Sequence, residues 1–305
     1  QGTGSLSSRL QKSLSHHSKY IVMLSLVILI TGIWGTSKVY IDTSFLANFE
    51  EDSAIAQTDQ FVNSKFGGTS TLNIILSGED SDLFKHPEVL QAMDSMQEEL
   101  EKDPIVGNTL SLATFIKQMN QVMLEHEEGS YSIPESQELV SQYLLLYEFS
   151  GDPETLEQVV DYEYSAANST VQLKSDSSAV LKNILTVVDT YRPIFAEHAI
   201  EVSYAGSGYK AFIFSELLLE GQIVSLAISF LIIVLLVAIL FKNWRIGLVG
   251  TVPIAITAVV NFGIMGLLGI PLSSATALIT SIAIGIGVDY AIHFLEHYTN
   301  ERLGG

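Results

Sequence analysis

The chain has 305 residues, of which 48% are hydrophobic, and it carries 34 acidic side chains, 15 basic ones and no cysteine. A basic nucleic-acid-binding surface is excluded, because neutralising phosphates requires a Lys/Arg patch and the sequence has none. Disulfides and thiolate metal sites are excluded because the chain has no cysteine. The formal charge of −19 contrasts with a mean hydropathy of +0.34, because charge is segregated: residues 43–216 hold 29 acidic and 8 basic side chains. We therefore expect an acidic soluble domain within an otherwise apolar, nearly neutral chain.

The apolar part contains four stretches long enough to cross a bilayer, which takes about 20 helical residues. Residues 1–5 resemble a cloning remnant and residues 1–19 a cytoplasmic segment. The predicted transmembrane helices are residues 20–41, 217–242, 246–268 and 272–298, and residues 299–305 form a cytoplasmic end at which the chain looks truncated.

The positive residues predict the orientation of these helices. Arg9, Lys12 and Lys19 precede the first span, and Lys242 and Arg245 lie between the second and third. Short loops rich in Lys and Arg mark the cytoplasmic side. We therefore expect a multi-pass protein of the cell membrane. Residues 42–216 are expected to form an extracytoplasmic domain, and residues 43–216 are the part expected to lie wholly outside the membrane.

The extracytoplasmic domain is predicted to be mixed α and β. Strands are expected near residues 69–77, 105–110, 169–174 and 200–204, with helices after the first and third. We expect Asp176 to cap the second of these helices. A helical insertion is expected over about residues 113–164, and Gly206–Gly208 is expected to loosen the chain before the second span. The fold class is thus an α+β membrane protein, with four transmembrane helices and a split βαβ (ferredoxin-like) domain.

Asp289 is the residue most indicative of function, because it is an acid inside an otherwise neutral span. A charged carboxylate in hydrocarbon is costly, and burial raises a carboxyl pKa towards neutrality. Such a group can take a proton from one side and release it to the other. We therefore predict that Asp289 is a proton relay. The alternatives are a hydrogen bond to a neighbouring helix and a side chain that snorkels to the cytoplasmic face.

Other residues of the third and fourth spans are expected to assist. His293 lies one helical turn beyond Asp289 and is placed to share its proton, and Tyr290 is placed to donate a hydrogen bond to an adjacent helix. Four glycines are predicted to allow close helix packing: Gly263, Gly266, Gly285 and Gly287.

Enzyme motifs in the same region are weaker. His293–His297 reads H-x-x-E-H, an inverted zinc-protease pattern, yet it lies at a membrane boundary without a third ligand. Gly285–Asp289 resembles the GxGD pattern of intramembrane aspartyl proteases, but it is one residue too long and has no second aspartate. The sequence contains no P-loop, G-x-S-x-G or H-E-x-x-H motif. We therefore expect neither an enzyme nor a bound cofactor or metal, with the proton as the coupling ion.

Several longer stretches resemble a known family. These are Phe49–Ser53, Phe66–Gly68, Leu144–Tyr164, Glu220–Gln222 and, most specifically, Phe262–Phe294, in the order one span, large domain, three spans. Together they are similar to the resistance-nodulation-division (RND) superfamily, in its exporter branch of MmpL and Patched-related proteins.

The resemblance implies a duplicated architecture of which this chain is the N-terminal half, with a porter-like outer domain. It implies proton-motive-force-driven export of lipids or other hydrophobic molecules, with Asp289 and Tyr290 matching the family's Asp-Tyr pair. The expected partners are membrane lipids, a hydrophobic substrate, and a second RND half or a homodimer partner, with no nucleic acid. The alternatives are a SecD/SecF-like accessory of protein export and a non-transporting lipid- or sterol-sensing module.

Overall fold

The computed structural model describes residues 18–44, 46, 49–150, 153–240, 242, 244–273, 275–283, 285–287, 290 and 293. Its chain divides into two compact units. Residues 43–215 form what we call the acidic unit, and residues 1–42 with 216–305 form the apolar unit. Each unit is described by itself.

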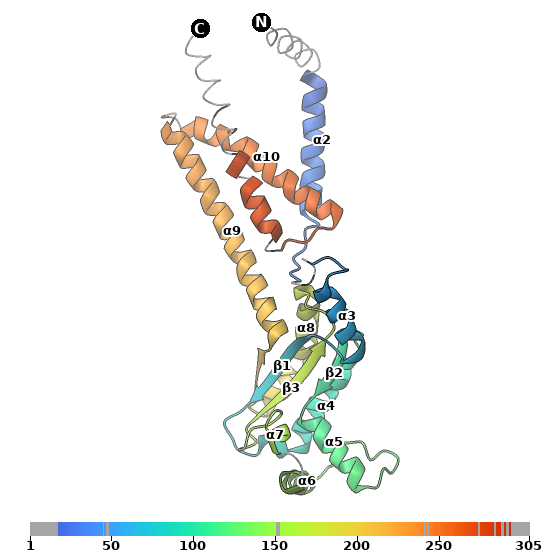
Figure 1. The fold of residues 1–305 in the computed structure, drawn as a ribbon. Coiled ribbons are helices and arrows are strands. Elements are labelled where there is room, and N and C mark those ends of the chain that lie inside the picture. The colour runs from blue at the N-terminus through green and yellow to red at the C-terminus, as the bar shows by residue number, and fades with distance from the viewer. Residues whose placement is uncertain are drawn as a thin grey trace, which may run out of the picture. The chain divides into compact units, whose positions relative to one another are not determined.

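The acidic unit is built on one four-stranded antiparallel sheet with helices on one face (Figure 1). In chain order its elements are α3 (Ala54–Lys65), β1 (Ser70–Ser77), η2 (Leu83–Lys85), α4 (Pro87–Glu101), β2 (Val106–Leu110), α5 (Leu112–Met123), α6 (Gln137–Ser150), α7 (Pro153–Leu156), β3 (Ala166–Leu173), α8 (Ser178–Glu197) and β4 (Glu201–Ala205). The strand order is β2-β3-β1-β4, and helices α4 and α8 follow β1 and β3. This is the order of a split βαβ unit.

The core of the acidic unit lies between the sheet and the two crossover helices. Burial alternates along β1 and β3, because successive side chains of a strand point to opposite faces. The core face of β1 is formed by Leu72, Ile74 and Leu76, all fully buried. Met93 and Met96 of α4 are fully buried in the same cluster, and α4 also contacts α8.

The start of α8 differs from the sequence prediction. Ser177, not Asp176, is the N-cap, and its side chain accepts a hydrogen bond from the backbone N–H of Val180. The prediction that Asp176 caps this helix is therefore wrong. Because Ser177 fills that role, the Asp176 carboxylate accepts hydrogen bonds from Ser44 Oγ and from the backbone N–H of Leu46 instead.

The insertion between β2 and β3 is helical, as α5, α6 and α7. A buried amide ties it together: Asn120 Nδ2 donates to the carbonyls of Ser130 and Ser132 at 2.9 and 3.0 Å, and its Oδ1 accepts from the Tyr143 hydroxyl at 3.0 Å. Asn120 is 5% exposed. One side chain thus joins α5 to α6 and to the intervening loop.

Gly206–Gly208 does not form a loose linker, because helix α9 (Ser207–Leu240) begins at Ser207. Gly206 has φ of +102°, which lets the chain turn directly from β4 into the helix. A β-carbon on Gly208 would lie 2.8 Å from Ser70 Oγ. The absence of side chains at these two positions therefore allows α9 to begin close against β1.

The apolar unit contains α2 (Ser18–Thr36), the membrane part of α9, α10 (Trp244–Leu268) and a shorter apolar helix, Ala275–Gly287. By length and composition, two described helices are able to cross a membrane: Ser207–Ile239 and Thr251–Leu268. In the most apolar stretch of the first helix, only 6% of the residues are buried, whereas the core helix of a soluble domain is mostly buried. The predicted first and fourth spans correspond to helical stretches of shorter described length, Met23–Thr36 and Ala275–Gly287.

Candidate functional site

The predicted proton-relay segment lies at the C-terminal end of the described chain. Asp289 lies outside the described residues, so the relay assignment stays a prediction. Tyr290 and His293 are described as helical, and the Tyr290 side chain is 74% exposed. Of the H-x-x-E-H run, only His293 belongs to the described part of the chain.

Side-chain hydrogen bonds hold the apolar helix Ala275–Gly287 against its neighbours. Asn261 Nδ2 of α10 donates to Thr280 Oγ1 at 2.8 Å, and Thr280 is 1% exposed. Gln222 Nε2 of α9 donates to Ser281 Oγ at 2.8 Å. Polar side chains within apolar helices pair across helices because hydrocarbon offers no other partner. Sequence reasoning missed these pairs, although amide residues inside otherwise apolar stretches were a signal.

Glycines bring α2 and α10 into backbone contact. A β-carbon on Gly263 would lie 2.6 Å from the Gly32 carbonyl oxygen, and one on Gly266 would overlap the Gly35 carbonyl. Gly32 and Gly35 are the partners that the sequence interpretation did not identify. A β-carbon on Gly285 or Gly287 would meet no described atom within 4 Å, so a packing role for those two glycines stays a prediction.

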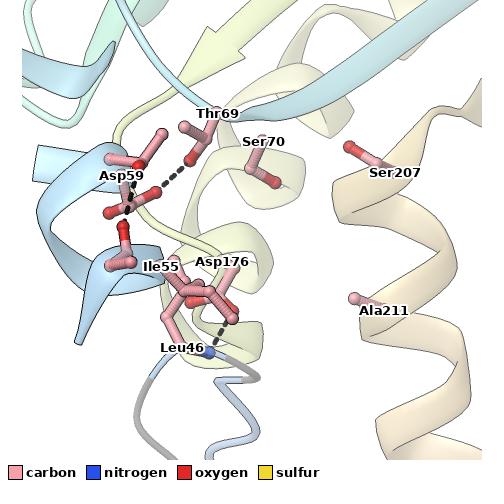
Figure 2. Close-up of a pocket in the computed structure, with 10 residues that line it drawn as sticks. Leu46, Ile55, Asp59, Thr69, Ser70, Asp176, Ser207 and Ala211 are labelled. Carbon is pink, nitrogen blue, oxygen red and sulfur yellow. Dashed lines mark hydrogen bonds between the residues drawn. The ribbon is translucent and has the colours of Figure 1, made fainter. Parts of the chain in front are cut away.

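The acidic unit contains a pocket that sequence reasoning did not identify. Its volume is about 560 Å³, and most of its lining is apolar. Figure 2 shows α9, with Ser207 and Ala211, on one side and α3 on the other. The lining residues that the structure describes are Leu46, Ala54, Ile55, Thr58, Asp59, Thr69, Ser70, Asp176, Ser207 and Ala211.

Two carboxylates stand in the pocket wall, each held by hydrogen bonds. Asp59 accepts from Thr69 Oγ1 at 2.5 Å and from Asn63 Nδ2 at 2.8 Å. Asp176 accepts from Ser44 Oγ at 2.5 Å and from the Leu46 N–H at 3.0 Å (Figure 2 draws the second). These contacts link α3 to β1 and the segment before α3 to the start of α8, so the same bonds that build the wall also orient its charges.

Other ionisable groups of the acidic unit belong to its internal structure. Burial alone would lower the pKa of Lys117, but its hydrogen bond to Asp94 at 2.7 Å and the charge of that carboxylate outweigh burial and raise it. Burial, and then a 2.8 Å hydrogen bond to Asp189, raise the pKa of Tyr204 to about 12. Neither Lys117 nor Tyr204 lines the pocket.

A metal site is not found in the described part of the chain. No three His, Asp or Glu side chains there gather closely enough to hold an ion. The pocket, with two carboxylates and several hydroxyl groups on an apolar wall, is suited to an amphiphilic organic molecule.

Comparison with known proteins finds a related membrane protein and a solved structure that resembles this chain. The protein MJ1562 of Methanocaldococcus jannaschii, whose name describes it as a membrane protein, is 26% identical over 308 residues, covering 96% of this chain and 76% of its own length. The structure of the hedgehog release protein Disp from the water bear Hypsibius dujardini matches with a TM-score of 0.45 and 16% identity. That match covers 90% of this chain, which spans only 39% of Disp.

The model of the MMPL family matches residues 49–305, which include nearly all of the acidic unit and every later helix. A family of this kind supports a transporter-like membrane protein and a non-enzymatic function. Because the family model covers well over half of the chain, the chain belongs to the MMPL family.

Proposed function

We propose that this chain forms half of a proton-motive-force-driven exporter of lipids or other hydrophobic molecules. The observation that carries the proposal is the family match over residues 49–305, because it includes both the acidic unit with its pocket and the segment with Asp289. The MMPL match also favours this function over the SecD/SecF-like alternative.

In this proposal the acidic unit is a porter-like domain outside the membrane, and its pocket receives the substrate. Ligand pockets commonly measure about 300–1,000 Å³ and are mainly apolar with a few polar groups. The pocket, at about 560 Å³, has that size and character. Its apolar residues would accommodate hydrocarbon, and its hydroxyl and carboxylate groups would face the polar end of the substrate.

The coupling ion in this proposal is the proton, and Asp289 is its relay, assisted by Tyr290 and His293. Protonation would neutralise the carboxylate and change how its helix packs, since a charge in hydrocarbon demands a partner that a neutral acid does not. The hydrogen bonds of Asn261 and Gln222 support this role, because they attach the preceding part of the predicted fourth span, Ala275–Gly287, to two neighbours. The second half of the transporter would be another RND half or a second copy of this chain.

The test is Asp289→Asn in the full-length protein, reconstituted into liposomes with an imposed pH gradient. We expect loss of gradient-dependent lipid export and of the accompanying proton flux, measured with a fluorescent phospholipid and a pH-sensitive dye. Glu127→Gln removes one negative charge from the acidic unit and is expected to retain both activities. Retention of proton-coupled export by Asp289→Asn would refute the relay and favour a non-transporting sensor.

A second variant tests the pocket. Ala211→Trp places a large ring in the cavity, and we expect it to reduce export while leaving the Asp289 segment unaltered. Unchanged export by this variant, with a correctly folded protein, would contradict the role of the pocket.

A further inference from the structure

The charged residues that line the pocket of the acidic unit, among those that the structure describes, are all acidic. Two of its lining residues, Asp59 and Asp176, are acids, and none of the ten lining residues that the structure describes is basic. Ligands with a negative polar end would therefore meet like charge in this wall without a compensating cation. Ligands with a positive polar end would meet opposite charge beside an apolar surface.

Asp59 is the carboxylate whose charge the described structure leaves uncompensated. Its hydrogen-bond donors, the Thr69 hydroxyl and the Asn63 amide, are both neutral. The described residues contain five ion-pair contacts, and none of them involves Asp59. A carboxylate offers about four acceptor positions, so two neutral donors fix its orientation and leave further positions for a ligand.

The apolar surface beside Asp59 indicates where the rest of such a ligand would lie. Leu46, Ala54 and Ile55 line the same cavity, and Ala211 faces them from α9 (Figure 2). Ile55 is 50% exposed, so a hydrocarbon chain that covers it would remove apolar surface from water while a cationic end lies beside Asp59. The combination fits an amphiphile with a hydrocarbon part and a cationic end.

We propose that this pocket selects amphiphiles by the charge of their polar end, and that Asp59 determines the preference for cationic over anionic ones. The inference rests on the proposed function, since it takes the pocket to be the substrate site. It adds a substrate class, hydrophobic molecules with a cationic polar end, and a residue that recognises it.

The experiment compares three amphiphiles that share a dodecyl tail: dodecyltrimethylammonium, dodecyl maltoside and dodecanoate. The chain has no cysteine, so Gln60→Cys, at an exposed position of α3 outside the pocket lining, can carry a single environment-sensitive dye. Binding is measured on the full chain in nanodiscs of phosphatidylcholine, with dye-labelled protein as the common background. We expect the apparent Kd of the cation to be about tenfold lower than that of the anion, which corresponds to about 1.4 kcal/mol.

Asp59→Asn keeps an oxygen that can accept from Thr69 but removes the charge, and we expect it to reduce the preference to about twofold or less. Unchanged binding of the neutral maltoside would show that the pocket is still formed. Glu128→Gln removes the same charge from a residue that does not line the pocket, and it should preserve the tenfold preference.

Equal binding of cation and anion would overturn this inference alone, because the pocket would still be an amphiphile site. The same holds if Glu128→Gln reduces the preference as much as Asp59→Asn, since selection would then come from the charge of the whole unit. Absence of binding by all three amphiphiles would instead overturn the substrate site on which the inference rests.

Discussion

The contact between α2 and α10 leads to a prediction for Gly263→Ala. A β-carbon at this position would lie 2.5 Å from Gly32 Cα and 2.9 Å from the Gly32 carbonyl carbon. Carbon atoms pack at about 3.5–4.0 Å, so the two backbones would have to separate by about 1 Å. Overpacking of this kind costs about 1–3 kcal/mol.

The substitution also has a favourable part, because alanine is a better helix former than glycine by about 0.5–1 kcal/mol. The mid-range values therefore give a net loss of about 1 kcal/mol for Gly263→Ala. The matched control is Gly221→Ala in α9, where a β-carbon would meet no described atom within 4 Å. Only the helix-forming gain applies there, so this variant should be neutral or up to about 1 kcal/mol more stable.

The assay is denaturant unfolding of the chain in detergent micelles. The chain has two tryptophans, and Trp34 lies in α2 two residues beyond Gly32, so its fluorescence reports on this contact. We expect the midpoint of Gly263→Ala below that of the unmodified chain and that of Gly221→Ala at or above it. Equal midpoints for the two variants would show that the backbones do not approach as closely as described.

Three further predictions concern hydrogen-bonded side chains. Lys117→Met should lower the stability of the acidic unit by about 1–3 kcal/mol, because Lys117 is 10% exposed and Asp94 would lose its cation. Since folding raises the Lys117 pKa, its contribution should be complete below about pH 10.4 and disappear as pH rises through the folded pKa, as followed by near-UV circular dichroism. Asn120→Ala removes three buried hydrogen bonds, so we expect a loss of about 2–3 kcal/mol and faster hydrogen exchange in α5 and α6. Asn261→Leu and Thr280→Val should show a coupling of about 0.6 kcal/mol in a double-mutant cycle of unfolding in micelles.

The Lys117 prediction has a matched control, and each of the three has a result that would contradict it. Lys102→Met breaks an exposed pair with Glu99 and should lower stability much less than Lys117→Met does. A similar loss for Lys102→Met and Lys117→Met would contradict the importance of burial. Unaltered exchange in Asn120→Ala would show that the insertion is held by its apolar contacts. Additive effects of Asn261→Leu and Thr280→Val would indicate that the two side chains do not interact.

Local structure of the acidic unit could be predicted closely. The strand predicted near residues 69–77 is β1, Ser70–Ser77, because alternating apolar side chains mark a half-buried strand. The helix expected after that strand is α4, which begins at Pro87, a residue suited to the first position of a helix. The error at Asp176 is of the same local kind: Ser177 and Asp176 are both good N-cap residues, and only the position of Leu46 shows which role Asp176 takes.

Of the two candidate sites, one could be predicted from the sequence and the other could not. An acid in an apolar stretch identifies Asp289 from composition alone, since the cost of a charge in hydrocarbon does not depend on the details of packing. The pocket could not be identified in this manner. Its wall combines Leu46, α3, the start of β1, Asp176 and the start of α9, which are separated by long stretches of chain.

The sequence by itself determined the segregation of charge, the apolar helices, the strand and helix order of the acidic unit, and the resemblance to the RND superfamily. Each of these depends on residue type and on spacing within one segment. Only the tertiary structure decided which glycines of α2 meet Gly263 and Gly266, which amides pair with Thr280 and Ser281, and that Asp59 stands beside an apolar cavity. These are contacts between distant segments, and their partners become defined only when the chain has packed.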